Sequence, residues 1–569
     1  MALAPSHRTY RQPAQPDGLV AQPVHESGTS EAASPAALAA MVEAYVAEHP
    51  AAAVLEDGRV MFDMRRAKYS VAESHGRCIL QLWSEERNLV RSVISAQHRS
   101  SGLRLMTRKM GAAKPVALEL APTSDRRTPT AREAQRRQYL KLLERVLLRS
   151  FPDWKPEGLR AATDLEHSFG PAYVRGHLLR GTTAEAVIGV SAEESSAMAD
   201  GVLTLGLLWL DYCREHSVTR RTGPVRHYGG LKVIVPAGAW QTTAERMAWL
   251  NHGLAAFQLY TLDERSEELV EIDFHDTGNV ESRLVHAFDV ARSLERAQAG
   301  VARVMTLVPQ TARARVELRA RSAAEVGLLL HGLEFARVRN GAAANSFART
   351  EEITFGAGAH ETALNDETEP LCRELLARLF ASRQPDGVHG DALFRLQPER
   401  WLESRIRVGL DEFLPGLRGE FLYSQVPAIG AGERGMLDLL TLDREGRLVI
   451  LEVKADEDMH LPLQGLDYWL RVRALNAERR LERNRDTGAF ERQGYFAAAQ
   501  VAARVPKLLL IAPALRIHPS NEIVLRYLSP QVEWELIAVS EHWRRELKVV
   551  FRKRSSVPSL KFNQEMLSS

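Results

Sequence analysis

The clearest alternation of hydrophobic and polar positions lies in the last third of the chain. Short runs rich in Val, Ile and Leu alternate there with longer stretches whose apolar residues recur at helical spacing. The pattern predicts, in chain order, a helix at 398–413, strands at 419–428, 434–443 and 447–455, a helix at 461–481, and strands at 506–515 and 532–540. Pro398 suits the first turn of the opening helix. We therefore expect a mixed α/β domain with a core of order αβββαβ, followed by one further strand.

The pattern upstream also predicts mixed α/β structure, so the whole chain reads as a multidomain α/β protein. Apolar spacing predicts a helix at 36–48, strands after it, and a second helix at 85–99. A long helix is predicted at 131–150, and strands alternate with helices from 220 to 355, including a helix at 323–338. The expected divisions are a disordered leader at 1–35, a small α/β domain at 36–121, a further domain at 126–220, an α/β domain of unknown role at 221–355, a linker and helix at 356–390, and the C-terminal domain at 391–555.

Composition changes this picture only locally. The 569 residues carry a net charge of +2, with 45% hydrophobic and 26% charged residues, which is ordinary for globular protein. Residues 99–150 are uneven, with 13 Lys and Arg against 4 Asp and Glu. A second basic strip lies at 544–554. Such segments can follow a phosphate backbone, although a solvated helix face explains them equally well.

The three cysteines, Cys78, Cys213 and Cys372, are far apart and have no zinc-site spacing. This usage fits a reducing compartment, and we expect a cytoplasmic protein. The N-terminus has no charged segment followed by an apolar run, so no secretory signal is expected. No run of 18 apolar residues is present, so no association with a membrane is expected.

The apolar strand at 447–455 carries two charges that need an explanation. Alternation puts Glu452 and Lys454 on one face, where an unpaired charge is costly. A three-residue loop with Gly446 in the left-handed conformation would pair 438 with 452 and set Asp438 opposite Glu452. A two-residue loop would instead set Leu437 there. The glycine favours the first register.

Two adjacent carboxylates repel each other unless a cation lies between them. Hard oxygen ligands suit Mg²⁺ or Mn²⁺. A metal ion, a lysine and a water molecule are the groups that phosphodiester hydrolysis needs. A buried Glu–Lys pair that only braces the sheet is the alternative for an isolated ExK, and Asp438 weighs against it.

These residues resemble the PD-(D/E)xK, or restriction-endonuclease-like, nucleases over about residues 395–540. Asp438 matches the first acid of that family, and Glu452, Val453 and Lys454 match its ExK. The segment from Gln464 to Tyr468 is similar to the QxxxY signature of RecB-like members, and the hairpin resembles that of NucS-like endonucleases.

The resemblance implies roles for seven positions. Asp438, Glu452 and the Val453 carbonyl would bind the metal, and Lys454 would position the nucleophilic water. Gln464 and Tyr468 would support the lysine or touch DNA, and Glu403 would be a further acid near the metal. A solvated position also fits Glu403, because Glu399 and Glu412 share its helix, and a core aromatic role also fits Tyr468.

The segment at 126–220 resembles a copy of this core that has lost its charges. The residues aligned with Glu403, Asp438, Glu452 and Lys454 are, in that order, Glu144, Leu179, Gly189 and Ser191. We therefore interpret 126–220 as a degenerate nuclease-like domain, which could still bind a DNA backbone without metal. Chance similarity between two α/β units is the alternative.

The function predicted from the sequence is a Mg²⁺-dependent DNA nuclease, specifically an endonuclease, in DNA repair or defence. A non-catalytic DNA-binding scaffold with a relic nuclease fold is the alternative. RNA stays open as a substrate and a homo-oligomer as an assembly. No Walker A motif is present, so the chain is expected to lack its own ATP motor.

Overall fold

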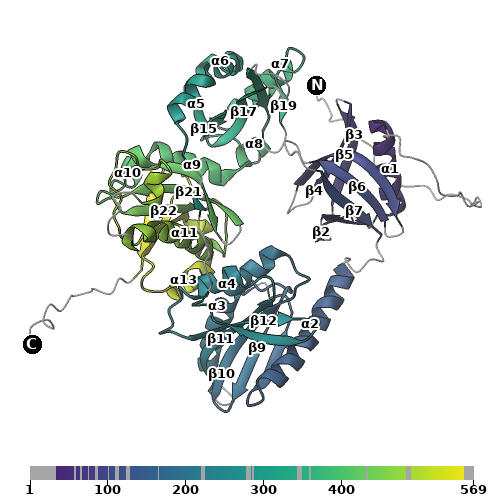
Figure 1. Cartoon of the computed structure of the whole chain (residues 1–569), viewed down its shortest axis with the longest axis vertical. Helices are drawn as coiled ribbons and strands as arrows, with labels where there is room; N and C mark the ends of the chain where they lie inside the picture. The colour runs from purple at the N-terminus through teal and green to yellow at the C-terminus, as the bar shows by residue number, and fades with distance from the viewer. Residues whose placement is uncertain are drawn as a thin grey trace, which may run out of the picture. The chain divides into compact units, whose positions relative to one another are not determined.

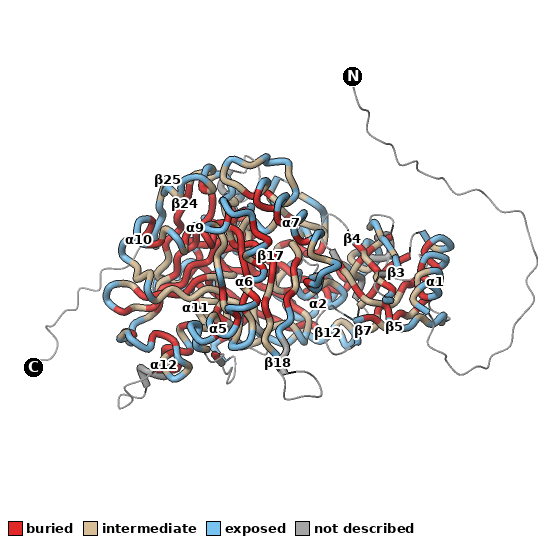
Figure 2. Tube along the Cα trace, turned by 90° about the horizontal axis from the view of Figure 1, so that it is seen from above, coloured by how far each residue is buried: buried red, intermediate tan, exposed pale blue. Residues whose placement is uncertain are grey.

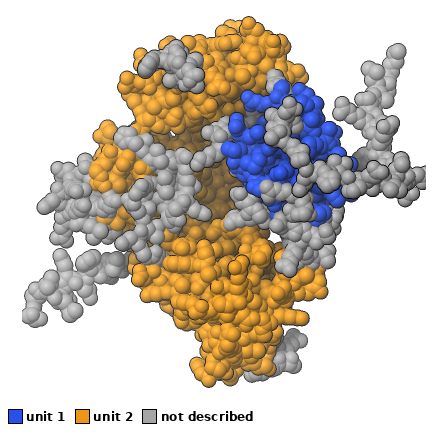
Figure 3. Space-filling model, turned by 45° about the vertical axis from the view of Figure 1, so that its right-hand side comes forward, with its two compact units in different colours: residues 1–127 blue, residues 128–569 orange. Residues whose placement is uncertain are grey.

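The computed structural model describes residues 34–555, and all statements of structure below concern these residues. It leaves out residues 1–33 and 556–569 and the internal positions 51, 57–58, 65–66, 75, 84–87, 100–101, 109–114, 123–128, 165, 220–224, 277–282, 285–286, 343–348, 358–360, 431–432 and 482–487. The predicted leader lies outside the described residues except for Ser34 and Pro35, which begin the first helix. The chain divides into two compact units, residues 1–127 and 128–569 (Figure 3).

The first unit holds the N-terminal domain, a helix with a seven-stranded antiparallel sheet of order β2-β1-β7-β6-β5-β4-β3. Its elements are α1 (Pro35–Glu48), β1 (Ala53–Glu56), β2 (Arg59–Asp63), β3 (Lys68–Ser74), β4 (Arg77–Trp83), β5 (Asn88–Arg99), β6 (Gly102–Arg108) and β7 (Val116–Ala121). The helix predicted at 85–99 is wrong, because residues 88–99 form strand β5. Leu89, Arg91 and Val93 are buried in alternation there, which is the period of a strand.

The second unit begins with the upstream domain, which we define as residues 129–272. Its six-stranded sheet has the order β13-β12-β11-β10-β9-β8. The elements are α2 (Pro129–Ser150), β8 (Lys155–Arg160), β9 (Tyr173–Arg180), β10 (Thr183–Val190), α3 (Ser196–Thr219), β11 (His227–Pro236), α4 (Gln241–Met247), β12 (Ala256–Asp263) and β13 (Glu268–Ile272). The sheet runs across the boundary expected at residue 220, since β10 pairs with β11.

The inserted domain, residues 290–382, has its own core and a five-stranded sheet of order β15-β16-β17-β18-β19. Its elements are α5 (Val290–Arg296), α6 (Gln298–Leu307), η1 (Gln310–Arg315), β15 (Val316–Ser322), β16 (Glu325–Leu330), β17 (Leu333–Ala342), β18 (Arg349–Phe355), β19 (Thr362–Ala363) and α7 (Glu369–Ser382).

The structure corrects two expectations for this domain. The helix predicted at 323–338 is the hairpin of β16 and β17, because His331 and Gly332 both have positive φ and form its two-residue turn. The helix expected within 356–390 is α7, but it is part of the inserted domain and not of a separate segment, because Cys372 and Leu376 are fully buried in the core of that domain.

The C-terminal domain, residues 398–554, has a seven-stranded sheet of order β14-β20-β21-β22-β23-β24-β25. Its α/β core has the predicted order αβββαβ, and the helix predicted at 461–481 is confirmed in both bounds. The elements that lead into it and form it are α8 (Ala392–Arg395), α9 (Pro398–Val408), α10 (Leu410–Phe413), η2 (Gly419–Phe421), β20 (Tyr423–Gly430), β21 (Glu433–Leu442), β22 (Leu448–Val453), α11 (Leu461–Leu481), α12 (Ala489–Arg492), β23 (Lys507–Pro513), η3 (Ala514–Arg516), α13 (Pro519–Arg526), β24 (Trp534–Val539) and β25 (Val549–Arg554), with the edge strand β14 (Arg283–Leu284).

The upstream and C-terminal sheets share one topology. Figure 1 shows each of them with helices beside it, among them α3 and α4 in the upstream domain and α11 and α13 in the C-terminal domain. In each, the first three strands are antiparallel neighbours, the third and fourth pair in parallel, the fourth and fifth also pair in parallel, and the sixth is antiparallel. A long helix, α3 or α11, joins the third strand to the fourth. A short one, α4 or α13, joins the fourth to the fifth. The strand orders therefore agree, as an internal repeat requires.

The buried residues follow the strands and the inner faces of the helices (Figure 2). In the C-terminal domain, residues of β22 alternate between two cores, one under α11 and one under α9. The three cysteines are buried and free. Among the described helices, none has the length and apolar character needed to span a membrane.

Candidate active site

The turn between β21 and β22 sets the register on which the site depends. Gly446 has φ +78° and its N–H donates to the Asp443 carbonyl at 3.1 Å, which closes the three-residue loop. The Asp443 carboxylate accepts the N–H groups of Glu445 and Arg447, both at 2.9 Å. Leu439 then pairs with Leu451. This is the predicted register, and continuing it by one pair sets Asp438 opposite Glu452.

The two carboxylates meet where the ladder between β21 and β22 stops. Beyond the Leu439–Leu451 pair, the Val453 N–H donates to Oδ2 of Asp438 at 3.1 Å. The Asp438 side chain is 19% exposed and that of Glu452 is 2% exposed. The site therefore has one carboxylate open to solvent above another that is fully buried.

Glu452 is held in a setting that opposes its negative charge. Burial raises its pKa well above the ordinary value, and the neighbouring Asp438 carboxylate raises it further, while Lys454 acts in the opposite direction. Nζ of Lys454 is 3.5 Å from Oε1 of Glu452. No described residue forms a hydrogen bond to Oε2.

Lys454 stands at the centre of a group of acids. Its Nζ lies 3.7 Å from Oδ2 of Asp458 and 3.9 Å from Oε1 of Glu399, in addition to Glu452. Burial by itself would lower the pKa of Lys454, but these carboxylates raise it above the ordinary value. Lys454 is thus a protonated donor at neutral pH. Glu399 and Asp458 are thus site residues that the sequence pattern does not predict.

The α11 residues predicted for the site lie on its helix above β22. Tyr468 is half-buried, and burial together with the charges of Glu452 and Asp438 raises its pKa, so its hydroxyl stays protonated. Gln464 carries a buried Oε1 to which no described residue donates a hydrogen bond. Tyr468 is therefore within electrostatic range of the paired acids.

Glu403 occupies a different setting from that expected of a metal-site acid. It is 2% exposed and accepts hydrogen bonds from Arg400 at 2.7 Å and from Arg319 of β15 at 3.3 Å. Its charge is therefore matched by two guanidinium groups. One of them belongs to the inserted domain, so Glu403 joins that domain to α9.

Gln425 is a site residue that the sequence reading missed. Its Nε2 donates to Oδ1 of Asp438 and to Oε2 of Glu403, both at 3.3 Å. Arg400 also reaches Oδ1 of Asp438 at 3.7 Å. Gln425 has φ +55°, an uncommon backbone conformation for this residue. That positive φ is visible only in the structure, and no sequence motif marks it.

The donor set fits a hard divalent cation in one respect. Asp438 and Glu452 supply carboxylate oxygens, one of them buried without a hydrogen-bond donor, and a cation between them would remove their repulsion. The described residues contain no group of three or more His, Cys, Asp or Glu side chains arranged as metal ligands. A metal here would therefore need a main-chain carbonyl, such as that of Val453, and water.

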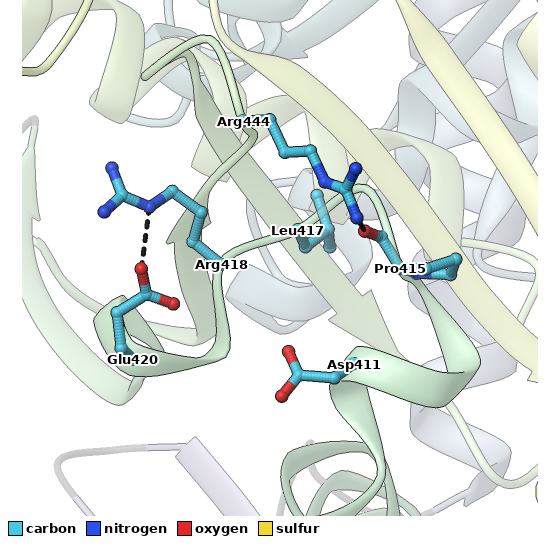
Figure 4. A pocket seen from close by; sticks show the side chains of 6 residues that line it. All are labelled: Asp411, Pro415, Leu417, Arg418, Glu420 and Arg444. Carbon is cyan, nitrogen blue, oxygen red and sulfur yellow. Dashed lines mark hydrogen bonds and ion pairs between the residues drawn. The ribbon is translucent and has the colours of Figure 1, made fainter.

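Two cavities lie near this hairpin. One of about 380 Å³ is at its turn, where Arg444 donates to the Pro415 carbonyl and Arg418 to Glu420 (Figure 4). It contains none of the predicted site residues. The second, of about 160 Å³, lies between the inserted domain and α9, and its lining includes Arg400. Arg400 connects this second cavity with Asp438, whose Oδ1 lies 3.7 Å from its Nη1.

The basic strips are partly neutralised within the chain. Arg136 pairs with Glu194 and Arg137 with Glu133, while residues 109–114 and 123–128 lie outside the described part. In β25, Arg552 and Arg554 both pair with Glu535. These charges are therefore less available to a partner than the sequence suggested.

Matching the two sheets identifies the upstream counterparts of the paired acids. Pro236 and Pro513 end the equivalent strands β11 and β23, which matches Val233 with Leu510. Val233 pairs with Ile188, and Leu510 with Glu452. Ile188 therefore holds the position of Glu452, and Val190 that of Lys454.

Arg175 lies opposite Ile188 and so holds the position of Asp438. Helices α3 and α11 are aligned by Gly206 and Gly465. A Cβ added to Gly206 would contact Leu231, and one added to Gly465 would contact the equivalent Leu508. This places Trp209 at the position of Tyr468.

The alignment of Leu179, Gly189 and Ser191 with the site is therefore wrong. Leu179 pairs with Ala184, and a Cβ at Gly189 would meet Tyr139 and Leu143 on the other face of the sheet. A shift of one residue exchanges the faces of a strand. The conclusion that the upstream domain lacks both acids and the lysine is unchanged.

A comparison with protein-family models found no match for this chain, and a comparison with curated proteins found none either.

Proposed function

We propose that the C-terminal domain is a divalent-metal-dependent nuclease that hydrolyses phosphodiester bonds of DNA. The observation that carries this proposal is that the partly exposed Asp438 lies opposite the buried Glu452 on the neighbouring strand. Nζ of Lys454 lies 3.5 Å from the buried carboxylate. Like charges held together in a dry setting oppose folding, so a function is the better reason for them. The resemblance to PD-(D/E)xK nucleases points to the same chemistry.

In this proposal, Asp438, Glu452 and the Val453 carbonyl hold Mg²⁺ or Mn²⁺. The bound ion would neutralise charge on the phosphate and favour a hydroxide nucleophile. The Asp438 carboxylate is already oriented by the Val453 N–H and by Gln425. Glu452 is fixed by its buried strand. Both ligands are thus preorganised on rigid elements.

Lys454 orients the attacking water and stabilises the negative charge that develops on the phosphate oxygens. The carboxylates of Glu399 and Asp458 keep its ammonium group in place. A bond forms from the water oxygen to phosphorus, and the bond from phosphorus to one ester oxygen breaks. The water gives up a proton to solvent, and the leaving oxygen takes one up.

The test compares the full chain with Asp438→Asn and Lys454→Ala on duplex DNA, single-stranded DNA and RNA, with Mg²⁺ or Mn²⁺. We expect each substitution to reduce DNA cleavage at least about 100-fold, the range for groups that act on reacting atoms. Glu445→Gln is the matched control, because Glu445 is exposed in the turn of the same hairpin. It should cleave like the wild type.

Thermal unfolding with and without Mn²⁺ gives a readout independent of catalysis. The ion should raise the Tm of the wild type and of Glu445→Gln, and should do so less for Asp438→Asn. Cleavage that survives Asp438→Asn would refute the site. Binding of DNA without cleavage of any nucleic acid would favour a non-catalytic DNA-binding scaffold.

A further inference from the structure

The upstream and C-terminal domains pack around a local twofold axis. Leu250 follows α4 and Leu528 follows α13, the equivalent helix, and the two leucines pair with each other in an antiparallel bridge. The Asn251 N–H donates to the Tyr527 carbonyl at 2.7 Å, and the Ser529 N–H donates to the Trp249 carbonyl at 2.8 Å. The two bonds are reciprocal, as a twofold axis through the bridge requires.

The long helices obey the same symmetry. α3 contacts α13 of the other domain, and α11 contacts α4. Gly201 and His460 occupy equivalent places on α3 and just before α11, and the His460 ring lies 3.0 Å from where a Cβ of Gly201 would be. A residue that meets its own counterpart lies on the axis. The pair of domains is therefore arranged like a symmetric dimer within one chain.

At the upstream counterpart of the acids, two arginines lie side by side. Arg160 of β8 pairs across the ladder with Arg175 of β9, which holds the position of Asp438. The guanidinium of Arg160 lies 5.2 Å from the centre of the Trp209 ring, and that of Arg175 lies 5.7 Å from it. Arg175 also stacks on Phe169 at 4.4 Å. The aromatic rings thus hold both cations at this position.

The charge of this pair is not cancelled by a carboxylate. The Arg160 side chain is exposed, and no hydrogen bond or ion pair joins it to another described residue. Arg175 is 1% exposed, donates through Nη1 to the Ala162 carbonyl at 2.9 Å, and has no described partner at Nε. Asp164, whose charge acts on Arg175, is itself paired with His167 at 3.0 Å.

The C-terminal site attracts a phosphate only when a cation offsets the charges of Asp438 and Glu452. At the equivalent position, the upstream domain has the permanent positive charges of Arg160 and Arg175. We infer that the upstream domain is a metal-independent phosphate-binding site, in which Arg160 contacts a DNA backbone phosphate and Arg175 adds charge beneath it. The choice of duplex DNA as the ligand rests on the proposed nuclease function. The twofold arrangement of the domains matches the twofold symmetry of the two backbones of a duplex.

The experiment measures binding of a labelled DNA duplex to the full chain in EDTA, where no divalent ion is present, over a range of salt concentrations. Arg160→Ala should weaken this binding about tenfold, the factor for one charge-assisted hydrogen bond. It should also reduce the slope of log affinity against log salt by about 1. Arg160 is exposed, so the substitution should leave the fold intact, which the Tm checks.

Two further variants make the outcome specific. Arg265→Ala is the matched control, because Arg265 is an exposed arginine in the β12–β13 turn of the same domain. It should bind like the wild type. Glu445→Gln, a change in the exposed turn of the C-terminal hairpin, should also keep its affinity in EDTA.

The inference is overturned if Arg160→Ala binds as the wild type does in EDTA, if Arg265→Ala loses as much affinity, or if the wild type binds no duplex without metal. Absence of cleavage in every metal-containing reaction would instead refute the nuclease proposal. In that case the measurements in EDTA would still decide whether the upstream site binds phosphate.

Discussion

At the scale of single residues, Glu452 departs furthest from the setting that a carboxylate prefers. It is 2% exposed, it lies beside Asp438, and its Oε2 has no described hydrogen-bond donor. The charge of Lys454 favours the ionised form of Glu452, but it offsets the effects of burial and Asp438 only in part. A buried carboxylate in such a place is destabilising while it is ionised and no cation binds it.

This setting predicts a pH dependence of stability for the metal-free chain. The folded-state pKa of Glu452 is raised above its value of 4.5 in the unfolded chain, so the stability linked to its proton is present below pH 4.5 and is lost as pH rises towards the raised value. At pH 7 to 8 in EDTA, Glu452→Gln should therefore have the higher Tm. We expect a gain of at least about 2 °C, the shift that about 1 kcal/mol produces in a domain of this size.

The measurement is the difference in Tm between Glu452→Gln and the wild type as pH falls towards 4.5. The difference should shrink, and Mn²⁺ should raise the Tm of the wild type but not that of Glu452→Gln. The exposed Glu445→Gln should give a difference that hardly changes with pH. A Glu452→Gln variant that is less stable than the wild type at pH 7 in EDTA would contradict this account.

At the scale of elements, the β21–β22 hairpin depends on Gly446 twice. Its φ of +78° is unfavourable for residues with a side chain, and a Cβ would come within 2.3 Å of the Gln500 carbonyl oxygen. The equivalent hairpin β9–β10 turns at Gly181, whose φ is +61° and whose Cβ position is open. Both positions therefore need a left-handed backbone, but only at Gly446 would a side chain also collide with a neighbour, the Gln500 carbonyl.

Alanine at these two positions should separate the two effects. Gly181→Ala should cost about 1 kcal/mol, from the left-handed backbone alone. Gly446→Ala should cost at least about 1–3 kcal/mol more, because the turn must move away from Gln500. Calorimetric unfolding of the full chain measures both. DNA cleavage should fall for Gly446→Ala only, since the register that opposes Asp438 to Glu452 begins at this turn. Equal losses of stability would argue against a role for the contact with Gln500.

At the scale of the whole molecule, two domains with one topology contain one set of paired acids. The upstream domain has Arg175, Ile188 and Val190 where the C-terminal domain has Asp438, Glu452 and Lys454. A twofold pair with a single reactive site can act on one strand of a duplex in each encounter. The second strand needs a new encounter.

The proposed nuclease should therefore nick supercoiled plasmid. Nicked circles should accumulate before linear DNA appears, and the initial rate should rise in proportion to protein concentration. A time course on agarose gels at several protein concentrations measures this. Linear DNA that forms from the first time point in step with nicks, or a rate that rises with the square of concentration, would contradict it.

The sequence by itself determined the features that depend on local geometry. The period of two set Glu452 and Lys454 on one face, and a glycine-containing loop predicted the pairing of 438 with 452 that β21 and β22 have. The bounds of α11 followed from apolar spacing and its flanking residues. Local patterns failed where turn geometry intervened, as at His331 and Gly332, or where a strand carried polar residues, as in β5.

Only the tertiary structure decided which distant residues share a site. Gln425 and Arg400 contact Asp438, and Asp458 contacts Lys454. Glu403 instead accepts a hydrogen bond from Arg319 of the inserted domain. The upstream arginines likewise became counterparts of the acids only when the two sheets were matched strand by strand. Such contacts depend on the register and packing of segments far apart in the chain, which no local pattern of residues encodes.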